Sequence, residues 1–579
     1  MKPVRFLLTW PKASAGNIEH IALSTGRPCR VPSPDGPRLW VEHEEHVLDA
    51  GERGIVIGYL FERTTGRRVT RLPRDILQRH DPSSFALWLT SQCWGAYVAL
   101  HVEGLHLRVY PDPSGLLPVY RSEIAEGQAC TSDLTLLKSH CSSKPRVSWH
   151  DLASHLQRPD WRDQRTCLAG IEELPAGQMT SWTNEGATSV AVWHATQFMP
   201  DKETQAFDEL AVELRNTAQR VMRAWGSVSG RLLVSASGGV DSSLIAAALA
   251  TVGQDFACLT IATGDPSGDE RVPVRMLANA LGVECFEACY TPERVDLAAP
   301  VSLGLARPSG KAFMQEVRRH AIKAAGRSGA SAVVDGNGGD NLFCYLHSAA
   351  PILDRWRSEG LSHGAAATYL DMCRIAQTTA PAMARALSMR ARRGSRPAAW
   401  AADRRLLASD VPAFGTPEVI ADLAQAVPLT HPGKIDHLTL LLRTQNFIHS
   451  ASGPADPLQF SPLMSQPLLE LCLSIPTWIW CHGGINRALA RAAFAQELPA
   501  AVVRRVSKAG PDSVMRVIFA HNRTLIRDML LGGLLRANGL LDAAAIEQAI
   551  ASDPHGKEPT IYRLLDLVEA EAWARSWQP

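Results

Sequence analysis

Short apolar runs alternate with helical patterns between residues 231 and 337, and this alternation constrains the fold more than any other feature of the chain. The runs are RLLVSAS, FACLTIAT and SAVVDGN, and the patterns between them include VPVRMLANALGV and FMQEVRRHAIKAAG. A strand that is apolar on both faces has to be covered on both faces, and a helix between two strands makes them parallel. The sequence therefore predicts an open parallel sheet with helices on both sides.

The first part of the chain has a different pattern, made of short strands and turns. In GAYVALHVEGLHLRVYPDPSGLLPVY, apolar and polar residues alternate over two runs that meet at Glu103-Gly104, which predicts a hairpin within a sheet. The polar stretch MPDKETQ, residues 199–205, predicts a linker. Because 579 residues exceed what one core usually holds, we expect one domain over 1–198 and a second over 206–579, with a helical insertion at about 350–445.

Composition excludes several classes of protein. A hydrophobic fraction of 46% with 20% charged residues is typical of a globular chain, and a formal net charge of +1 gives no reason to expect nucleic acid as a partner. No apolar run reaches the roughly 18 residues that a membrane-spanning helix needs, and Pro11 interrupts the apolar start too early for a secretory signal. The cysteines are scattered, as is usual for reduced thiols, so we expect a cytoplasmic protein without a membrane partner.

The loop SGGVDSS follows the first apolar run and precedes an alanine-rich helical pattern. Its glycines allow successive N–H groups to face one point, and the following helix directs its positive end there, which is typical of a phosphate site. The loop lacks the lysine of G-x-x-x-x-G-K-[ST], so it suits pyrophosphate that leaves when a carboxylate attacks the α-phosphorus. A plain glycine-rich turn is the alternative. The predicted nucleotide contacts are Ser235, Ser237, Gly238, Gly239, Asp241 and Ser242.

A second acidic loop, VVDGNGGDNLF, follows the third apolar run and spans residues 333–343. Because ligands of an open parallel sheet lie beyond the carboxyl ends of its strands, Asp340 and Asp241 are expected at the same edge. Two carboxylates there suit Mg2+ on the triphosphate of ATP, with Gly336 near the nucleotide. Taken alone, this loop is equally compatible with a capping turn.

The order of these elements resembles that of the asparagine synthetase superfamily. SGGVDSS is similar to its pyrophosphate loop, GNGGDNLF to its second motif and LTIATGDPSGDE to its adenosine-side strand, which implies that Thr263 and Gly264 lie near the nucleotide. DPSGLLPVY, ACTSDLTLL and GIEELPAG resemble motifs of its glutaminase domain. The resemblance implies an α+β, Ntn-hydrolase-like β-sandwich followed by an α/β synthetase domain of the pyrophosphatase (PP-loop) type, with a largely helical C-terminal part.

Several positions depart from the family pattern. Lys2 stands where glutamine-using members have a nucleophilic cysteine, so we expect an N-terminal domain without glutaminase activity. Asn337 replaces the usual glutamate, or the tyrosine of the β-lactam-forming branch, and cannot be a general base. Pro457 stands where the glutamate of the family's E-A-R-V-P-F-L-D stretch would align, and the neighbouring Asp456 is a candidate substitute for that glutamate. Arg487 stands where a phosphate-binding lysine is typical. Lys508, one residue beyond the family lysine, is expected to stabilise the oxyanion, with a surface lysine as the alternative.

The relatives that lack the cysteine include β-lactam synthetases, carbapenam synthetases and lasso-peptide macrocyclases. The G-N-G-G-D-N loop, the helical insertion and the R-x-S-K-x-G ending resemble the macrocyclases most. The resemblance implies that ATP and Mg2+ are used to adenylate an Asp or Glu side chain of a leader-free precursor peptide, that the peptide's N-terminal amine attacks, and that a leader peptidase is a partner protein.

Two other functions stay open at this point. One is an amide ligase, asparagine-synthetase-like or β-lactam-synthetase-like, that acts on a small amino acid. The other is a non-catalytic relative that binds nucleotide, against which the retention of Ser237, Asp241 and Asp340 argues.

A basic cluster in the insertion has no role in this scheme. Its members are predicted to form a solvated helix end before Pro397: Arg385, Arg390, Arg392, Arg393 and Arg396.

Overall fold

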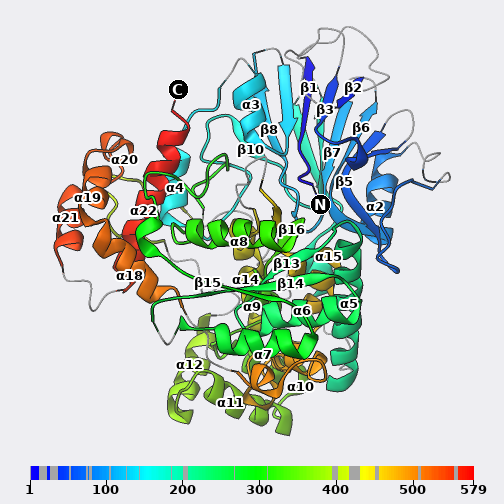
Figure 1. Ribbon diagram of the computed structural model, residues 1–579, viewed down its shortest axis with the longest axis vertical. Coiled ribbons are helices and arrows are strands. Elements are labelled where there is room, and N and C mark those ends of the chain that lie inside the picture. The colour runs from blue at the N-terminus through cyan, green and yellow to red at the C-terminus, as the bar shows by residue number, and fades with distance from the viewer. Residues whose placement is uncertain are drawn as a thin grey trace.

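The computed structural model places a β-sandwich above a larger α/β unit, with a group of C-terminal helices along one side (Figure 1). The structure describes residues 2–11, 22–25, 37–50, 54–73, 76, 81–103, 106–125, 127–141, 144–183, 186–199, 206–265, 268–309, 311–393, 402–415, 431–449, 456–505, 510–552 and 558–578. Most of the predicted linker, together with Arg396 and Lys508, lies outside the described residues.

The sandwich consists of two sheets whose inner faces enclose a core that includes Phe6, Leu8, Val98 and Val109. The first sheet has the order β10 (Ile171–Glu173), β8 (Tyr120–Ile124), β9 (Gly127–Thr131), β1 (Phe6–Pro11), β3 (Arg38–Val41), β2 (Ala22–Thr25). The second has the order β12 (Gly186–Ala191), β11 (Gln178–Thr183), β7 (His106–Pro111), β6 (Cys93–Glu103), β5 (Gly54–Glu62), β4 (Val47–Asp49). Helices cover both outer faces: α2 (Pro82–Gln92) the second sheet, and α3 (Leu134–His140) and α4 (Trp149–Gln157) the first.

The predicted hairpin is confirmed as the antiparallel pair β6–β7, in which Glu103 lies opposite His106. The turn after β7 is held by the buried carboxylate of Asp112, which accepts hydrogen bonds from the amides of Ser114 (3.0 Å) and Leu117 (3.2 Å). Burial raises the pKa of Asp112 to about 6.

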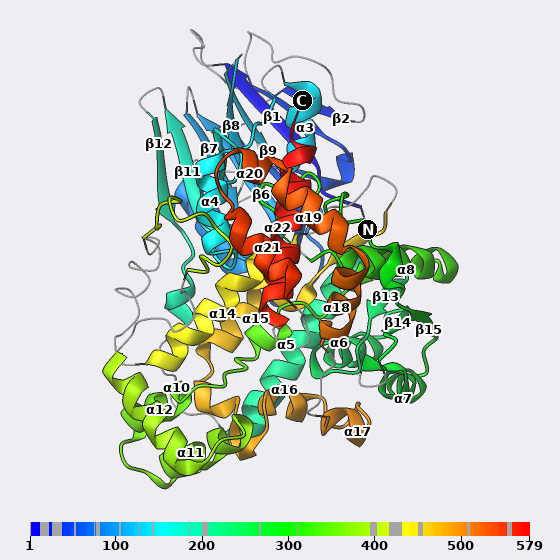
Figure 2. The ribbon, with the colours of Figure 1, turned by 90° about the vertical axis from the view of Figure 1, so that its left-hand side faces the viewer.

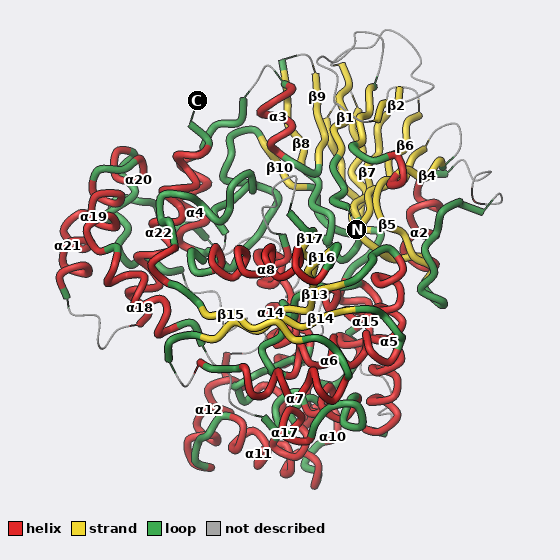
Figure 3. The backbone as a smooth tube through the Cα atoms, viewed as in Figure 1, coloured by secondary structure: helices red, strands yellow, loops and turns green. Residues whose placement is uncertain are grey.

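The second unit contains the predicted parallel sheet, with helices on both faces (Figure 3). Its order is β15 (Cys285–Cys289), β14 (Phe256–Ala262), β13 (Leu232–Ser235), β16 (Ala332–Val334), β17 (Leu458–Phe460), and every neighbouring pair is parallel. One face packs against α5 (Phe207–Ser227) and α6 (Val240–Thr251), with α7 (Arg271–Leu281) beside them; the other packs against α8 (Met314–Ser328). The edge strand β17 was not expected, because the chain after residue 350 was predicted to be mainly helical.

The chain after the sheet is otherwise helical, as expected. The predicted insertion contains α10 (Ala350–Glu359), α11 (His363–Ile375), α12 (Ala380–Arg393) and α14 (Pro432–Ile448), which follow the short α9 (Gly339–Leu342). The remaining helices are α15 (Gln466–Ser474), α16 (Ala488–Ala493), α17 (Ala500–Val503), α18 (Asp512–His521), α19 (Arg523–Leu531), α20 (Leu534–Ala537), α21 (Ala543–Ala551) and α22 (Glu558–Ser576). Figure 2 shows α18–α22 on the side that faces the viewer, from the level of the sandwich down to that of the parallel sheet. Arg563 of α22 donates to the carbonyl oxygen of Leu156 in α4 (2.8 Å).

The prediction of a solvated basic helix end is wrong for Arg390. Its side chain is buried and donates to the Asp436 carboxylate (3.0 Å) and to the carbonyl oxygen of Pro432 (3.2 Å), both in α14. A buried guanidinium needs such partners, and they fix α12 against α14. Among the described residues, no helix is long and apolar enough to cross a membrane.

Candidate active site

The first loop connects β13 to α6 at the carboxyl edge of the parallel sheet. Gly238 has φ +61°, and a Cβ there would lie 2.8 Å from Pro273 and 2.9 Å from Arg505, so only glycine fits. The N–H of Ser237 donates to the hydroxyl of Ser242 (3.2 Å), which closes the loop, and no side chain caps the N-terminus of α6. The loop follows Ser235 directly and leaves the first amides of a twelve-residue helix for an anion.

The second loop lies directly against the first. A Cβ at Gly336 would be 3.0 Å from the amide nitrogen of Ser242, and one at Gly339 would overlap the Asp241 carboxylate. The loop is anchored by Asp335, a buried carboxylate whose pKa is raised by burial. Asp335 accepts from the hydroxyl of Ser461 (2.6 Å) and from the backbone N–H of the half-buried Asn337 (3.0 Å).

One guanidinium joins the two predicted metal carboxylates. Arg487 Nη1 donates to both oxygens of Asp241, at 3.1 and 3.0 Å, and also to Asp340 Oδ1. Arg487 itself is buried, lies over the Tyr345 ring at 5.0 Å, and precedes α16 with φ +54°. The sequence predicted Arg487 on the phosphates; here the guanidinium contacts the carboxylates, because a buried carboxylate requires a cationic or hydrogen-bonding partner.

The two carboxylates fit Mg2+ on a triphosphate. No cluster of three or more His, Cys, Asp or Glu side chains suited to a metal occurs among the described residues. Among the described residues, Asp241 and Asp340 therefore stay the two candidate ligands. Mg2+ is commonly bound in this way, by one or two carboxylates with the remaining ligands from substrate phosphates and water.

The adenosine-side residues follow β14, the neighbour of β13. Thr263 donates from its hydroxyl to the carbonyl oxygen of Asp265 (3.3 Å), and Gly264 is exposed, with open space where a side chain would be. Both residues lie at the same edge of the sheet as the two loops, and their contact with adenosine stays a prediction.

Two arginines that the sequence did not single out support the first loop and Arg487. Arg505 donates to the carbonyl oxygen of Ser237 (2.8 Å) and to Glu270 (3.1 Å). Arg491 donates to the side chain of Asn486 (2.9 Å), and burial lowers its pKa to about 10. Their segment is rich in arginine, so its basic character was visible in the sequence but the individual partners were not. Lys508, in the same segment, lies outside the described residues.

Asp456 lies away from Asn337, and its proposed substitution for the family glutamate stays a prediction. It precedes β17, and β17 runs parallel to β16 with Ala332 opposite Leu458, so Asp456 lies at the opposite edge of the sheet from Asn337. At about 3.3 Å per residue the separation along the strands exceeds roughly 15 Å. The Asp456 carboxylate instead pairs with Arg318 of α8.

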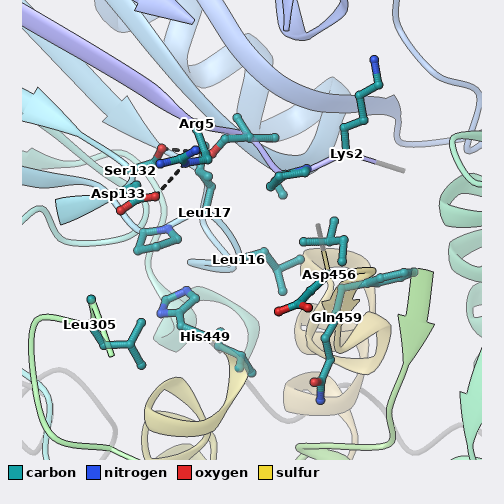
Figure 4. A pocket seen from close by; sticks show the side chains of 18 of the residues that line it. Lys2, Arg5, Leu116, Leu117, Ser132, Asp133, Leu305, His449, Asp456 and Gln459 are labelled. Atoms are coloured by element: carbon teal, nitrogen blue, oxygen red, sulfur yellow. Dashed lines mark hydrogen bonds and ion pairs between the residues drawn. The ribbon is translucent and has the colours of Figure 1, made fainter. Parts of the chain in front are cut away.

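A cavity of about 720 Å³ lies between the sandwich and β17 (Figure 4). Its walls include Lys2 and Arg5 of the sandwich and Asp456 and Gln459 of the second unit. The backbone of Lys2 is held by Tyr59, and its ammonium pairs with Glu45 at 2.8 Å, a hydrogen bond that lowers the pKa of Glu45 to about 2. No cysteine is among the described residues that line this cavity.

The site and the sheet are those of a nucleotide-dependent ligase, and the chain belongs to the asparagine synthase family. Residues 209–575, more than half of the chain, match the model of that family. This membership supports an ATP-dependent ligase of the asparagine synthetase type. No curated protein matches the chain.

Among solved structures, the chain is similar to NMN synthetase from Francisella tularensis, with 16% identity over 25% of this chain and 60% of that chain, at a TM-score of 0.19. An allosteric regulatory enzyme of purine biosynthesis matches 44% of this chain and 64% of its own at 12% identity and a TM-score of 0.18. Glutamine PRPP amidotransferase from B. subtilis matches 49% of this chain and 70% of its own, at 11% identity and a TM-score of 0.17. The chain thus spans less than two thirds of the first two structures, and such low TM-scores carry no argument.

Proposed function

We propose that the protein is a macrocyclase that joins an Asp or Glu side chain of a leader-free precursor peptide to the peptide's own N-terminal amine. The observation that carries the proposal is that Asp241 and Asp340 both contact the guanidinium of Arg487, beside a phosphate loop that contains no lysine. Such a site suits departure of pyrophosphate, and hence an acyl-adenylate. It also disfavours the non-catalytic alternative, because nucleotide binding alone does not need both carboxylates.

The reaction has two steps. The side-chain carboxylate attacks the α-phosphorus of ATP, and the bond to the bridging oxygen breaks, so that pyrophosphate leaves and an acyl-adenylate remains. The N-terminal amine then attacks the carbonyl carbon, AMP leaves with the bonding electron pair, and the nitrogen loses a proton. The peptide product is lighter by one water.

The chain's own residues hold the groups that carry charge in the first step. The amides at the start of α6 and the hydroxyls of Ser237 and Ser242 would bind the pyrophosphate, and Asp241 and Asp340 would hold Mg2+. Mg2+ neutralises phosphate charge. Arg487 contacts both of these carboxylates, and its proposed role is to hold a phosphate oxygen when ATP is bound.

The second step proceeds beside Asn337, which accepts no proton at neutral pH. An amine tethered to the carboxylate needs less help, since good orientation can supply on the order of 7–11 kcal/mol of a barrier. Lys508 is proposed to stabilise the tetrahedral oxyanion.

The size of the cavity favours a peptide over the alternative of a small amino acid. At about 720 Å³ it is far larger than a free amino acid requires, and Ile448 and His449, at the end of the insertion helix α14, form part of its wall. A leader peptidase partner and a cytoplasmic location belong to the same proposal.

The test uses the full chain with ATP, Mg2+ and leader-free peptides that bear Asp or Glu seven to nine residues from a free N-terminus. AMP, pyrophosphate and a peptide lighter by one water are expected, measured by a pyrophosphate assay and mass spectrometry on the same sample. Formation of ADP, or reaction with free amino acids but with no peptide, would overturn the proposal.

A further inference from the structure

The large cavity lies beyond the free edge of the parallel sheet. Trp225 of α5 and Arg318 of α8, which cover opposite faces of this sheet, both contribute to its wall. Because residues from both faces of the sheet line the cavity, the cavity lies beyond the edge strand, which is β17. All of β17 and the following Ser461 line the cavity, and Figure 4 shows Gln459 at its wall.

The backbone of Gln459 is directed toward this space. The carbonyl oxygen of Phe460 accepts from the N–H of Asp335 (3.2 Å), so Phe460 is a residue that bonds to β16. In a parallel pair alternate residues bond to opposite sides, and the N–H and C=O of Gln459 therefore point away from β16. Neither group has a hydrogen-bond partner within the part of the chain that the structure describes. A donor and an acceptor on one half-buried residue match the backbone of an extended peptide.

The same residue is linked to the second active-site loop. The side chain of Gln459 donates to Asp335 (2.7 Å), which also accepts from Ser461 and from the backbone N–H of Asn337. A chain bonded to the edge of β17 is thus fixed relative to the loop that carries Asp340.

We infer that an extended segment of the peptide substrate binds in the cavity as an additional strand on β17, with one residue exchanging both backbone hydrogen bonds with Gln459. This inference rests on the proposed function. The amine and the acceptor side chain have to meet at the carboxyl edge of the sheet, so only the residues beyond the acceptor can extend away from it. That tail runs antiparallel to β17, toward Asp456, with side chains against Leu116 and Phe460.

A matched pair of variants isolates the Gln459 N–H. Gln459→Ala keeps the N–H and loses the bond to Asp335, whereas Gln459→Pro loses both, and proline is tolerated where an edge N–H faces away from the sheet. With a fluorescent leader-free peptide, Gln459→Pro is expected to bind roughly five- to tenfold more weakly than Gln459→Ala. Equal dissociation constants in two variants with matched thermal midpoints would overturn the inference.

A scan of the peptide tests the same bond in the unaltered protein and does not depend on whether the proline variant folds. Single N-methylation along the tail is expected to weaken binding roughly five- to tenfold at one position and less than twofold at the positions on either side. If peptides are cyclised but the scan is flat, the strand on β17 is wrong while the proposed function stands. If no peptide is bound or adenylated, both fail.

Discussion

Two arginine–carboxylate clusters in this molecule differ in which group is shared. Arg487 is one guanidinium shared by Asp241 and Asp340, whereas Glu173 is one carboxylate shared by Arg162 and Arg307. The first cluster lies at the carboxyl edge of the parallel sheet, and the second joins the sandwich to the helical unit.

The excess charge of the second cluster is satisfied by neutral acceptors. Arg307 donates to the carbonyl oxygen of Arg165 (2.7 Å), and Arg162 donates to His449 Nδ1 (2.8 Å), while His449 Nε2 donates to the carbonyl oxygen of Gly115 (2.8 Å). This cluster is complete within the chain. In the acid-rich cluster two carboxylates share the guanidinium of Arg487, and in the proposed function they also hold the Mg2+ that is brought with ATP. The difference separates a structural joint from a reactive site.

The largest expected effect is on the acid-rich cluster. Asp241→Asn or Asp340→Asn keeps the shape of the side chain but removes a charge, so pyrophosphate release with peptide should fall more than about 100-fold while the thermal midpoint changes little. Asp255→Asn, an aspartate whose side chain is 71% exposed, is the control and should be unaffected. Near-normal pyrophosphate release by Asp241→Asn would show that the acid-rich cluster is not the reactive site.

The arginine-rich cluster should respond in stability instead. Glu173→Gln leaves two buried guanidinium groups without their carboxylate, which is expected to destabilise the protein by about 3–5 kcal/mol. The neighbouring Glu172 pairs with Arg121 but is half exposed, so Glu172→Gln should cost no more than about 1 kcal/mol. Chemical denaturation of the two variants measures the difference, and equal stabilities would contradict a joint at Glu173.

Acid should weaken the same joint. Burial, followed by the charge of Arg162, lowers the pKa of His449 to about 3, so the unfolded chain takes up a proton first and stability falls as the pH drops from about 6.5 toward 3. Burial alone would raise the pKa of Glu173, but Arg162 and Arg307 outweigh burial and lower the pKa to about 2. The contribution of Glu173 to stability is therefore lost as the pH falls from about 4.5 to about 2. The shift of the thermal midpoint between pH 7 and pH 5 should be smaller in His449→Gln than in the unaltered protein. An equal shift would show that His449 does not contribute to the acid destabilisation.

The smallest effect expected is none at all. The large cavity presents Lys2 and no cysteine among its described lining residues, so the purified protein should release no ammonia from glutamine, and glutamine should not stimulate ATP use. A coupled ammonia assay measures this, and detectable glutaminase activity would show that the sandwich is catalytic.

The sequence predicted those parts of the molecule that depend on local patterns. The strands β13, β14 and β16 were recognisable because each is apolar throughout, and the meeting of Asp241 with Asp340 followed from the direction of parallel strands. The three-residue β17 is too short to show any period. Pairings between distant residues were equally hidden, such as Arg487 with Asp241, 246 positions apart, and Arg390 with Asp436. The edge position of Asp456 depended on the register of β17, which no local pattern records.

The most direct test of the central claim is exchange of labelled pyrophosphate into ATP with a peptide whose N-terminal amine is acetylated. Acetylation removes the nucleophile of the second step but leaves the Asp or Glu carboxylate that is adenylated in the first. We predict exchange that depends on that carboxylate, at a rate similar to that with the free peptide, and no loss of water from the acetylated peptide. Exchange without any peptide carboxylate, or ring closure of the acetylated peptide, would contradict the account.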